Sequence, residues 1–335
     1  MEILLLSSFW HAAKLEKGRR RWAVGGERRK TPKHDSPPPI HQPTPREQGL
    51  DKDSDGDADS DDVDETEKDD VDRDDYTKNK DDRKRSISCG CHLVEGKMRH
   101  GMEDYLVAKH KTINGHKLGL YAIFDGHSGR EVAEYLQNHL FENILNEPDF
   151  WTSPKAAVRK AYEATNKDIL ENVVGSRGGS TAVTAILIDK VDLIVANVGD
   201  SRGVICKSGT AKQITVDHEP MKEKKLVESK GGFVSKKRGN VPRVDGQLAM
   251  TRAFGDERLK DHITAEPYIA IKKIDEDTEF VILASDGLWK VMSNQEAVDC
   301  IRESRDGQEA AEELIKEALL REGKDDISCG VVMFH

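Results

Sequence analysis

The chain has 335 residues, of which 34% are charged and 36% hydrophobic, and its formal net charge at pH 7 is −10. The length suits one large or two small folded domains, and the low hydrophobic fraction indicates an additional polar, unfolded portion. The negative net charge argues against nucleic acid as the main partner. No run approaches the ~18 apolar residues that a membrane span needs. Five cysteines, an odd number without paired spacing, predict a reduced, intracellular location, in the nucleus and/or the cytoplasm.

Residues 1–85 are predicted to form a disordered tail, basic and proline-rich over residues 14–50 and acidic over residues 51–75. The segment Asp51–Asp62 matches the first half of an EF-hand loop, with acids at its first, third and fifth positions and glycine at the sixth. Its twelfth position is Asp62 instead of a bidentate glutamate, and no amphipathic helix flanks it. An acidic low-complexity segment is therefore favoured over a calcium site, which stays the alternative.

Residues 86–335 are predicted to form one folded domain, organised around the stretch Leu118–Arg130, which reads LGLYAIFDGHSGR. Its apolar first half is typical of a buried strand. The strand delivers Asp125, Gly126 and His127 to one sheet edge, and the pair Ser128 and Glu131 then matches the capping box that opens a helix.

Other apolar runs also carry acids at their ends. Phe280–Ser285 is followed by Asp286, and Leu193–Val198 is followed by Gly199 and Asp200. Glu103 and Asp104 precede the run 105–108, and Asp325 and Asp326 precede the run 327–334. Antiparallel neighbours place the end of one strand beside the start of the next. We therefore expect these acids to share one rim.

Helix signals form two groups that alternate with the strand signals. An apolar stripe with i, i+4 spacing follows Arg130, and Ser153 with Pro154 opens a second helix that ends near residue 170. Nearer the C-terminus, Ser293 and Glu296 form a capping box, and Asp306 starts a helix for which Gly323 is a fitting C-cap. Strands with two groups of paired helices predict α+β layers.

Four or five carboxylates with no basic cluster beside them, together with one histidine, favour hard divalent cations, magnesium or manganese over zinc. Two such ions about 4 Å apart can activate a bridging water and clamp a phosphoryl oxygen. Arg99 can contact the phosphate in bidentate fashion, and His127 can protonate the leaving oxygen. A single Asp-Gly pair is more often an ordinary turn, so the interpretation depends on the joint occurrence.

Other phosphate chemistries lack their motifs in this chain. No cysteine has an arginine six positions later, no P-loop glycine-lysine motif is present, and the kinase HRD and DFG elements and the HExxH zinc motif are absent.

The sequence resembles the metal-dependent serine/threonine phosphatases of the protein phosphatase 2C type, in particular the plant members. Seven motifs carry the resemblance, in family order, over roughly residues 88–335. They are Arg99-His-Gly-Met-Glu103-Asp104, Phe124-Asp-Gly-His-Ser-Gly129, Gly179-Ser-Thr-Ala182, Asn197-Val-Gly-Asp-Ser-Arg202, Leu248-Ala-Met-Thr-Arg-Ala-Phe-Gly-Asp256, Ala284-Ser-Asp-Gly-Leu-Trp289 and Lys324-Asp-Asp-Ile-Ser328.

The resemblance implies a four-layer αββα sandwich, in which two central antiparallel sheets are flanked by antiparallel helix pairs, with residues 86–335 as the catalytic domain. It implies two magnesium or manganese ions and a weaker third ion near Asp200. The implied metal ligands are Asp125 as the bridge, the Gly126 carbonyl, Asp286, Asp325, and Glu103 in or next to the coordination shell. Arg99 would hold the phosphate and His127 would be the general acid. Asp256 is expected in a supporting role.

The implied activity is hydrolysis of phosphoserine and phosphothreonine by a water that two metal ions activate. Implied partners are phosphorylated proteins such as kinases and signalling proteins, and the chain is expected to be a monomer without nucleic-acid or membrane partners. A non-catalytic binding module on the same fold is the alternative, disfavoured because the acids are present. The segment Met221–Arg238, with seven basic residues against two acids, falls at the family's variable flap and favours acidic substrates or is simply a solvated helix face.

Overall fold

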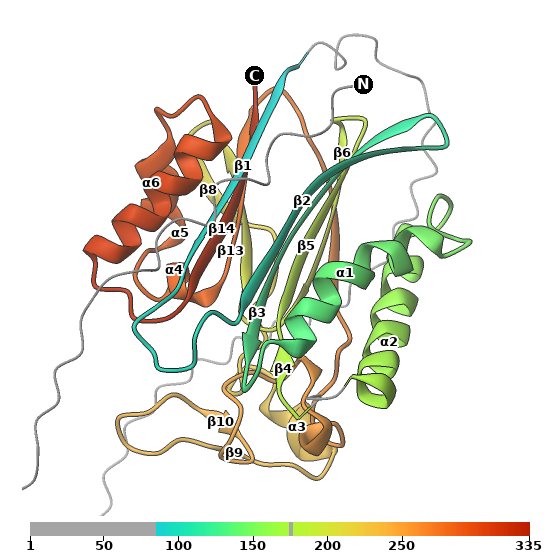
Figure 1. Cartoon of the computed structure of the whole chain (residues 1–335), viewed down its shortest axis with the longest axis vertical. Coiled ribbons are helices and arrows are strands. Elements are labelled where there is room, and N and C mark those ends of the chain that lie inside the picture. The colour runs from blue at the N-terminus through green and yellow to red at the C-terminus, as the bar shows by residue number, and fades with distance from the viewer. Residues whose placement is uncertain (1–84, 174–176) are drawn as a thin grey trace, which may run out of the picture. The chain divides into compact units, whose positions relative to one another are not determined.

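A computed structural model of the chain describes residues 85–173 and 177–335. The predicted tail, apart from Arg85, and its calcium alternative therefore lie outside the described residues. Figure 1 shows two central sheets between two groups of helices, so the predicted four-layer α+β sandwich is confirmed.

One sheet has seven strands and the other has five, and every pairing within them is antiparallel. In the seven-stranded sheet the order is β11-β4-β3-β5-β6-β12, with β2 paired to β3, and the strands are β2 (Asp104–Ile113), β3 (His116–His127), β4 (Gly179–Ser180), β5 (Ala182–Ile188), β6 (Asp192–Val198), β11 (Phe254–Gly255) and β12 (Tyr268–Lys273). In the five-stranded sheet the order is β1-β14-β13-β7-β8, and the strands are β1 (Ile87–Val94), β7 (Arg202–Lys207), β8 (Thr210–Gln213), β13 (Thr278–Ala284) and β14 (Ile327–Phe334).

Each sheet is covered by helices on its outer face. The seven-stranded sheet carries α1 (Glu131–Asn146) and α2 (Pro154–Asn172), and the five-stranded sheet carries α4 (Asp286–Trp289), α5 (Asn294–Ile301) and α6 (Gly307–Leu320). The long connection from β8 to β12 holds α3 (Lys224–Ser229), a small sheet of β9 (Val234–Ser235) and β10 (Arg243–Val244), and a 3-10 turn, Glu257–Leu259. None of the helices in the described ranges is long and apolar enough to cross a membrane.

Alternation along the central strands builds the layers. In β3, Ala122 and Phe124 pack in the core under α1 and α2, whereas Tyr121 and Ile123 pack in the core between the two sheets. Because both faces of the strand are buried, its sequence is a continuous apolar run instead of an alternating one. The same division holds in β13, where Val281 and its neighbours at every second position face the other sheet.

The predicted helix starts are mostly correct. In α5 the Ser293 hydroxyl accepts the Glu296 N–H and the Glu296 carboxylate accepts the Ser293 N–H, so the capping box is confirmed. Asp306 caps α6, and α2 begins at Pro154. The capping box predicted at Ser128 is wrong.

Two predicted helix boundaries differ from the structure. Helix α1 begins one residue after Arg130, and Ser128 instead takes a left-handed φ of 58° in the turn after β3. The end of α6 is a Schellman-type turn in which Glu322, not Gly323, has the left-handed conformation, with φ 63°. Gly323 follows it and donates its N–H to the Ala318 carbonyl. The C-cap prediction was therefore displaced by one residue.

Candidate active site

The strand register brings the predicted acids to one end of the sandwich. In the seven-stranded sheet, Asp104 at the start of β2 lies directly opposite Asp125 near the end of β3. In the other sheet, the Ser285 N–H donates to the Ser328 carbonyl, which sets the start of α4 beside the start of β14. The two sheets are joined here because the Ser328 hydroxyl donates to the Asp104 carboxylate over 2.6 Å. We call this end the acidic rim, formed by Asp104, Asp125, Asp200, Asp286 and Asp325.

The acids of the rim destabilise one another's charged forms. Burial raises the pKa of Asp125 well above its usual range, and the charges of Asp104 and Asp286 raise it further. Burial also raises the pKa of Asp104 to about 7, against the opposing hydrogen bonds from Ser328 and Ser285. For Asp200, burial followed by the charge of Asp286 raises the pKa to about 7. Such a rim favours binding of positive charge.

A lysine supplies part of that charge. The Lys290 ammonium lies 2.5 Å from the Asp286 carboxylate and 2.8 Å from the Asp325 carboxylate. The sequence interpretation noted that no basic cluster lies beside the acids, and it did not anticipate this single lysine. The available signal was the spacing of Asp286 and Lys290, which are four residues apart across the short helix α4 and so face each other.

The rim matches a hard cation in chemistry but is not a ready-made ligand set. Among the described residues, no three His, Cys, Asp or Glu side chains are already grouped so that they could hold a metal ion. Its donors are carboxylate oxygens, the ligands that magnesium and manganese prefer. One of them, Asp200 Oδ1, is buried without any hydrogen-bond partner in the described part of the chain. Oxygen donors and an unpartnered buried oxygen fit a divalent cation.

Glu103 and Gly126 lie against each other at this rim. A Cβ on Gly126 would come within 2.6 Å of the Glu103 carbonyl oxygen, so only glycine fits this close approach. The Glu103 carboxylate accepts the Gly129 N–H over 2.7 Å. The backbone N–H of Glu103 donates to the Asp326 carboxylate. Glu103 therefore stabilises the turn after β3.

The adjacent acids Asp325 and Asp326 differ in exposure and in the groups they contact. Asp326 is 5% exposed and accepts the backbone N–H groups of Gly96 and Glu103, which fixes the loop between β1 and β2. The Asp325 side chain is 39% exposed and points to Lys290. Of the two, Asp325 is the acid that remains accessible to a cation.

His127 is held by an acid that is distant in sequence. Its Nε2 lies 2.8 Å from the Asp256 carboxylate, whose side chain is 7% exposed, and its Nδ1 is buried without a partner in the described part of the chain. The pair packs so closely on Gly179 that a Cβ there would lie 2.2 Å from Asp256 Oδ2. Asp256 therefore contacts the His127 ring and sets its orientation.

Arg99 lies on the exposed loop between β1 and β2. Within residues 85–173 and 177–335 the Arg99 side chain makes no hydrogen bond or ion pair. Its guanidinium is therefore available to an anion.

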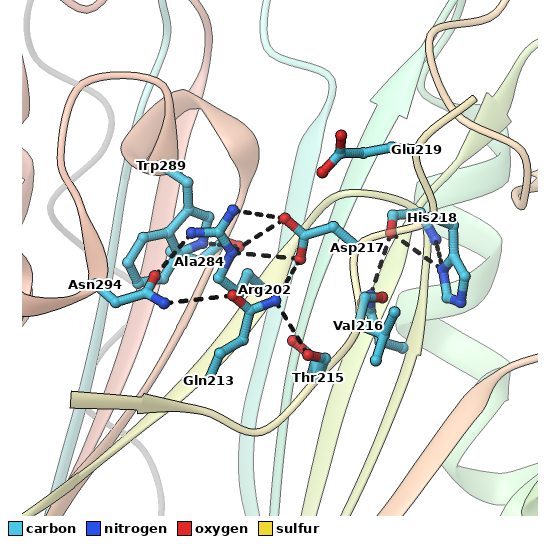
Figure 2. A network of polar contacts seen from close by, with 12 residues as sticks. Arg202, Gln213, Thr215, Val216, Asp217, His218, Glu219, Ala284, Trp289 and Asn294 are labelled. Atoms are coloured by element: carbon cyan, nitrogen blue, oxygen red, sulfur yellow. Dashed lines mark hydrogen bonds and ion pairs between the residues drawn. The ribbon is translucent and has the colours of Figure 1, made fainter. Parts of the chain in front are cut away.

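Behind α4, a polar network centres on Arg202 (Figure 2). The guanidinium is paired with the buried Asp217 through two nitrogens and donates from Nη1 to the Asn294 amide oxygen over 2.7 Å. It also lies over the Trp289 ring, 5.2 Å from its centroid. These contacts join β7, α4, α5 and the start of the β8–β12 connection. Sequence reasoning assigned no role to this network.

His218, next to Asp217, fixes the turn that carries Asp200. Its N–H donates to the Gly199 carbonyl over 3.0 Å, and its ring Nδ1 lies 3.1 Å from the Gly199 nitrogen. Burial, and after it the positive charge of Arg252, lowers the pKa of His218 to about 4. The imidazole is therefore neutral at pH 7 and can accept the Gly199 N–H.

The basic segment predicted at Met221–Arg238 spans α3 and β9. Two of its lysines are paired with glutamates close in sequence, Lys222 with Glu219 and Lys224 with Glu228. Large apolar side chains are exposed beside them, including Phe233 at 54%. Contact of this segment with acidic substrates stays a prediction.

Comparisons with known proteins agree with this architecture. The family model described as "Protein phosphatase 2C" matches residues 93–327. "Probable protein phosphatase 2C 28" of Arabidopsis thaliana is 65% identical over 252 residues, which cover 75% of this chain and 74% of that protein. "Probable protein phosphatase 2C 58" of the same plant is 57% identical over 262 residues, 78% of this chain and 93% of that protein.

A solved structure shares the fold. The crystal structure of serine-threonine phosphatase 2C from Toxoplasma gondii superposes with a TM-score of 0.64 at 22% identity, over 74% of this chain and 95% of that chain. With the family model matching well over half of its length, the chain belongs to the protein phosphatase 2C family of serine/threonine phosphatases.

Proposed function

We propose that this chain removes phosphate from phosphoserine and phosphothreonine in proteins, using magnesium or manganese ions held at the acidic rim. The observation that carries the proposal is the convergence of Asp104, Asp125, Asp200, Asp286 and Asp325, from five separate segments, at one end of the sandwich beside His127. Two ions are proposed, with a weaker third near Asp200.

Asp125, Asp286 and Asp325, with the Gly126 carbonyl, would hold the ions, and Glu103 lies next to them. When bound, such ions supply an activated water and neutralise charge on the phosphoryl group. A metal bound there would relieve the mutual repulsion that raises the pKa of Asp125.

The remaining steps are assigned to the chain's own side chains. Arg99 orients the phosphate through paired N–H donors. A water oxygen attacks the phosphorus, the phosphorus–oxygen bond to the serine or threonine breaks, and the leaving oxygen takes a proton from His127, which a proton released by the water replaces. Nε2 lies against the Asp256 carboxylate, which orients the ring for this transfer. The products are inorganic phosphate and the free hydroxyl.

The substrates are proposed to be phosphorylated proteins, among them kinases and other signalling proteins, acted on by a monomer inside the cell. Nucleic acid and membranes are not proposed as partners, since the described domain and the whole chain are acidic.

The test compares the wild-type chain with Asp286→Asn on a phosphothreonine peptide in the presence of Mn²⁺. We expect kcat/KM to fall at least about a hundredfold, because losing even a group that supports a metal ligand costs 10- to 100-fold. Asp299→Asn, an exposed acid on α5, is the matched control and should retain wild-type activity.

Equal rates for wild type and Asp286→Asn would overturn the proposal. If calorimetry also showed no binding of Mn²⁺, the alternative of a non-catalytic binding module on this fold would take its place.

A further inference from the structure

Lys290 differs from an ordinary surface lysine in what it contacts. Its ammonium is within 2.8 Å of carboxylates from two segments, Asp286 at the start of α4 and Asp325 before β14. Both carboxylates belong to the set proposed to hold metal. The ammonium therefore occupies the position between two metal-binding acids.

The position of Lys290 is fixed by the backbone and by its neighbour. The Lys290 N–H donates to the Asp286 carbonyl over 2.8 Å, which places the two side chains on one face of α4. The preceding residue, Trp289, donates from its indole N–H to the Ala284 carbonyl and lies under Arg202, as Figure 2 shows. The lysine thus extends from an anchored turn, and only its long side chain is free to move.

An ammonium and a divalent cation cannot both use these oxygens without repulsion. The ammonium lies at hydrogen-bond distance, whereas magnesium bonds carboxylate oxygens at about 2.0–2.1 Å. A metal bound to Asp286 and Asp325 would meet the full charge of Lys290 at short range. The Lys290 side chain is 53% exposed, so it has solvent into which it can withdraw.

We propose that Lys290 is a built-in counter-cation of the acidic rim, which joins Asp286 to Asp325 when no metal is bound and competes with the metal for these two carboxylates. It therefore stabilises the metal-free fold and weakens metal binding. The inference rests on the proposed function for its metal site, and it assigns the lysine a role that sets metal affinity.

The test uses the full chain and measures metal affinity, which should rise, and stability without metal, which should fall. In Lys290→Met the dissociation constant for Mn²⁺, measured by calorimetry, should fall at least about fivefold, because a competing unit charge has been removed. The melting temperature in chelator should fall by about 2 °C or more, because the rim loses its cation. Lys290→Gln, which keeps a polar end group, should show the same two changes.

Two control variants separate this role from general effects of a lost lysine. Lys207 forms an equally short ion pair, 2.5 Å from Asp275, away from the rim, so Lys207→Met should leave Mn²⁺ affinity unchanged. Lys290→Arg keeps the charge and should bind Mn²⁺ within about twofold of wild type.

The outcomes distinguish the two proposals. If the wild-type chain binds Mn²⁺ and both neutral Lys290 variants bind it with unchanged or weaker affinity, the inference is wrong and the proposed function stands. An unchanged melting temperature in chelator would also overturn it. A wild-type chain that binds no Mn²⁺ would overturn both.

Discussion

At the scale of single residues, the properties of this site are set by partners that are distant in sequence. His127 is the last residue of β3, and the Asp256 carboxylate, 129 residues further on, fixes its ring. The contact of Nε2 with Asp256 therefore sets the orientation of the imidazole.

Asp256→Asn tests whether this contact orients His127, the proposed general acid. We expect kcat on a phosphothreonine peptide to fall about 10- to 100-fold, since a misplaced general acid loses part of its 10²- to 10⁴-fold contribution. Hydrolysis of p-nitrophenyl phosphate should change less than about threefold, because its leaving group needs no proton. Parallel losses on both substrates in steady-state assays would show that Asp256 has only a structural role.

Asp104 is the second residue whose behaviour follows from its surroundings. Burial raises the pKa of its carboxyl to about 7, above the usual 3.8. A group whose pKa is raised on folding contributes stability below its unfolded pKa and loses it as pH rises through the folded pKa. The window of loss therefore runs from about pH 4 to just above 7.

In chelator, the melting temperature of the wild-type chain should decrease between about pH 5 and 7, while His218 stays neutral. Asp104→Asn removes the titrating carboxyl and should make this decrease smaller. Scanning calorimetry across this pH range provides the check, and equal slopes for the two proteins would contradict it. Asp200, with a pKa also raised to about 7, should preserve part of the slope in the variant.

At the scale of elements, helix ends show where local rules hold and where they yield. The box at Ser293 forms because its two partners are three residues apart and the backbone before them is extended. The turn after α6 is less favourable, since Glu322 occupies a left-handed position that usually belongs to glycine.

Glu322→Gly should stabilise the protein by about 0.5–1 kcal/mol, because removing the Cβ penalty of the left-handed conformation outweighs the added freedom of the unfolded chain. Chemical denaturation measures the change. Glu309→Gly is the matched control: Glu309 is exposed in the first turn of the same helix, and glycine there should destabilise by up to about 1 kcal/mol. Destabilisation by both substitutions would contradict the assignment.

At the scale of the whole molecule, the acidic rim exists because two sheets end together. The hydrogen bond between Ser328 and Asp104 links the sheets at this end, and the core between them, with Ile123 and Val332 among its members, holds them face to face. A change in the packing of the sheets would therefore change the distances among the acids.

The predicted domain boundary at residues 85/86 is open to a direct test. Arg85 donates to the Asp275 carbonyl, and its own carbonyl accepts a hydrogen bond from Lys190. We expect a chain that begins at Arg85 to melt within about 1 °C of the full chain, and one that begins at Ser86 to melt slightly lower, since it lacks these contacts. A large loss in the chain that begins at Arg85 would show that the tail contributes to folding.

The sequence by itself determined the main apolar strands, most helix starts and the list of acids, but not the strands β1, β7, β8 and β12. Apolar runs such as Phe280–Ser285 and caps such as Asp306 act over a few residues, so their signals are local. The intracellular location, the extent of the tail and the metal ligands stay predictions.

Only the tertiary structure decided which side chains meet. Lys290 sits between Asp286 and Asp325, Asp256 binds His127, and Arg202 pairs with Asp217, and each of these arrangements depends on how two sheets and their connections pack. The physical reason is that burial and electrostatic interactions depend on distances in space, which separation along the chain does not fix.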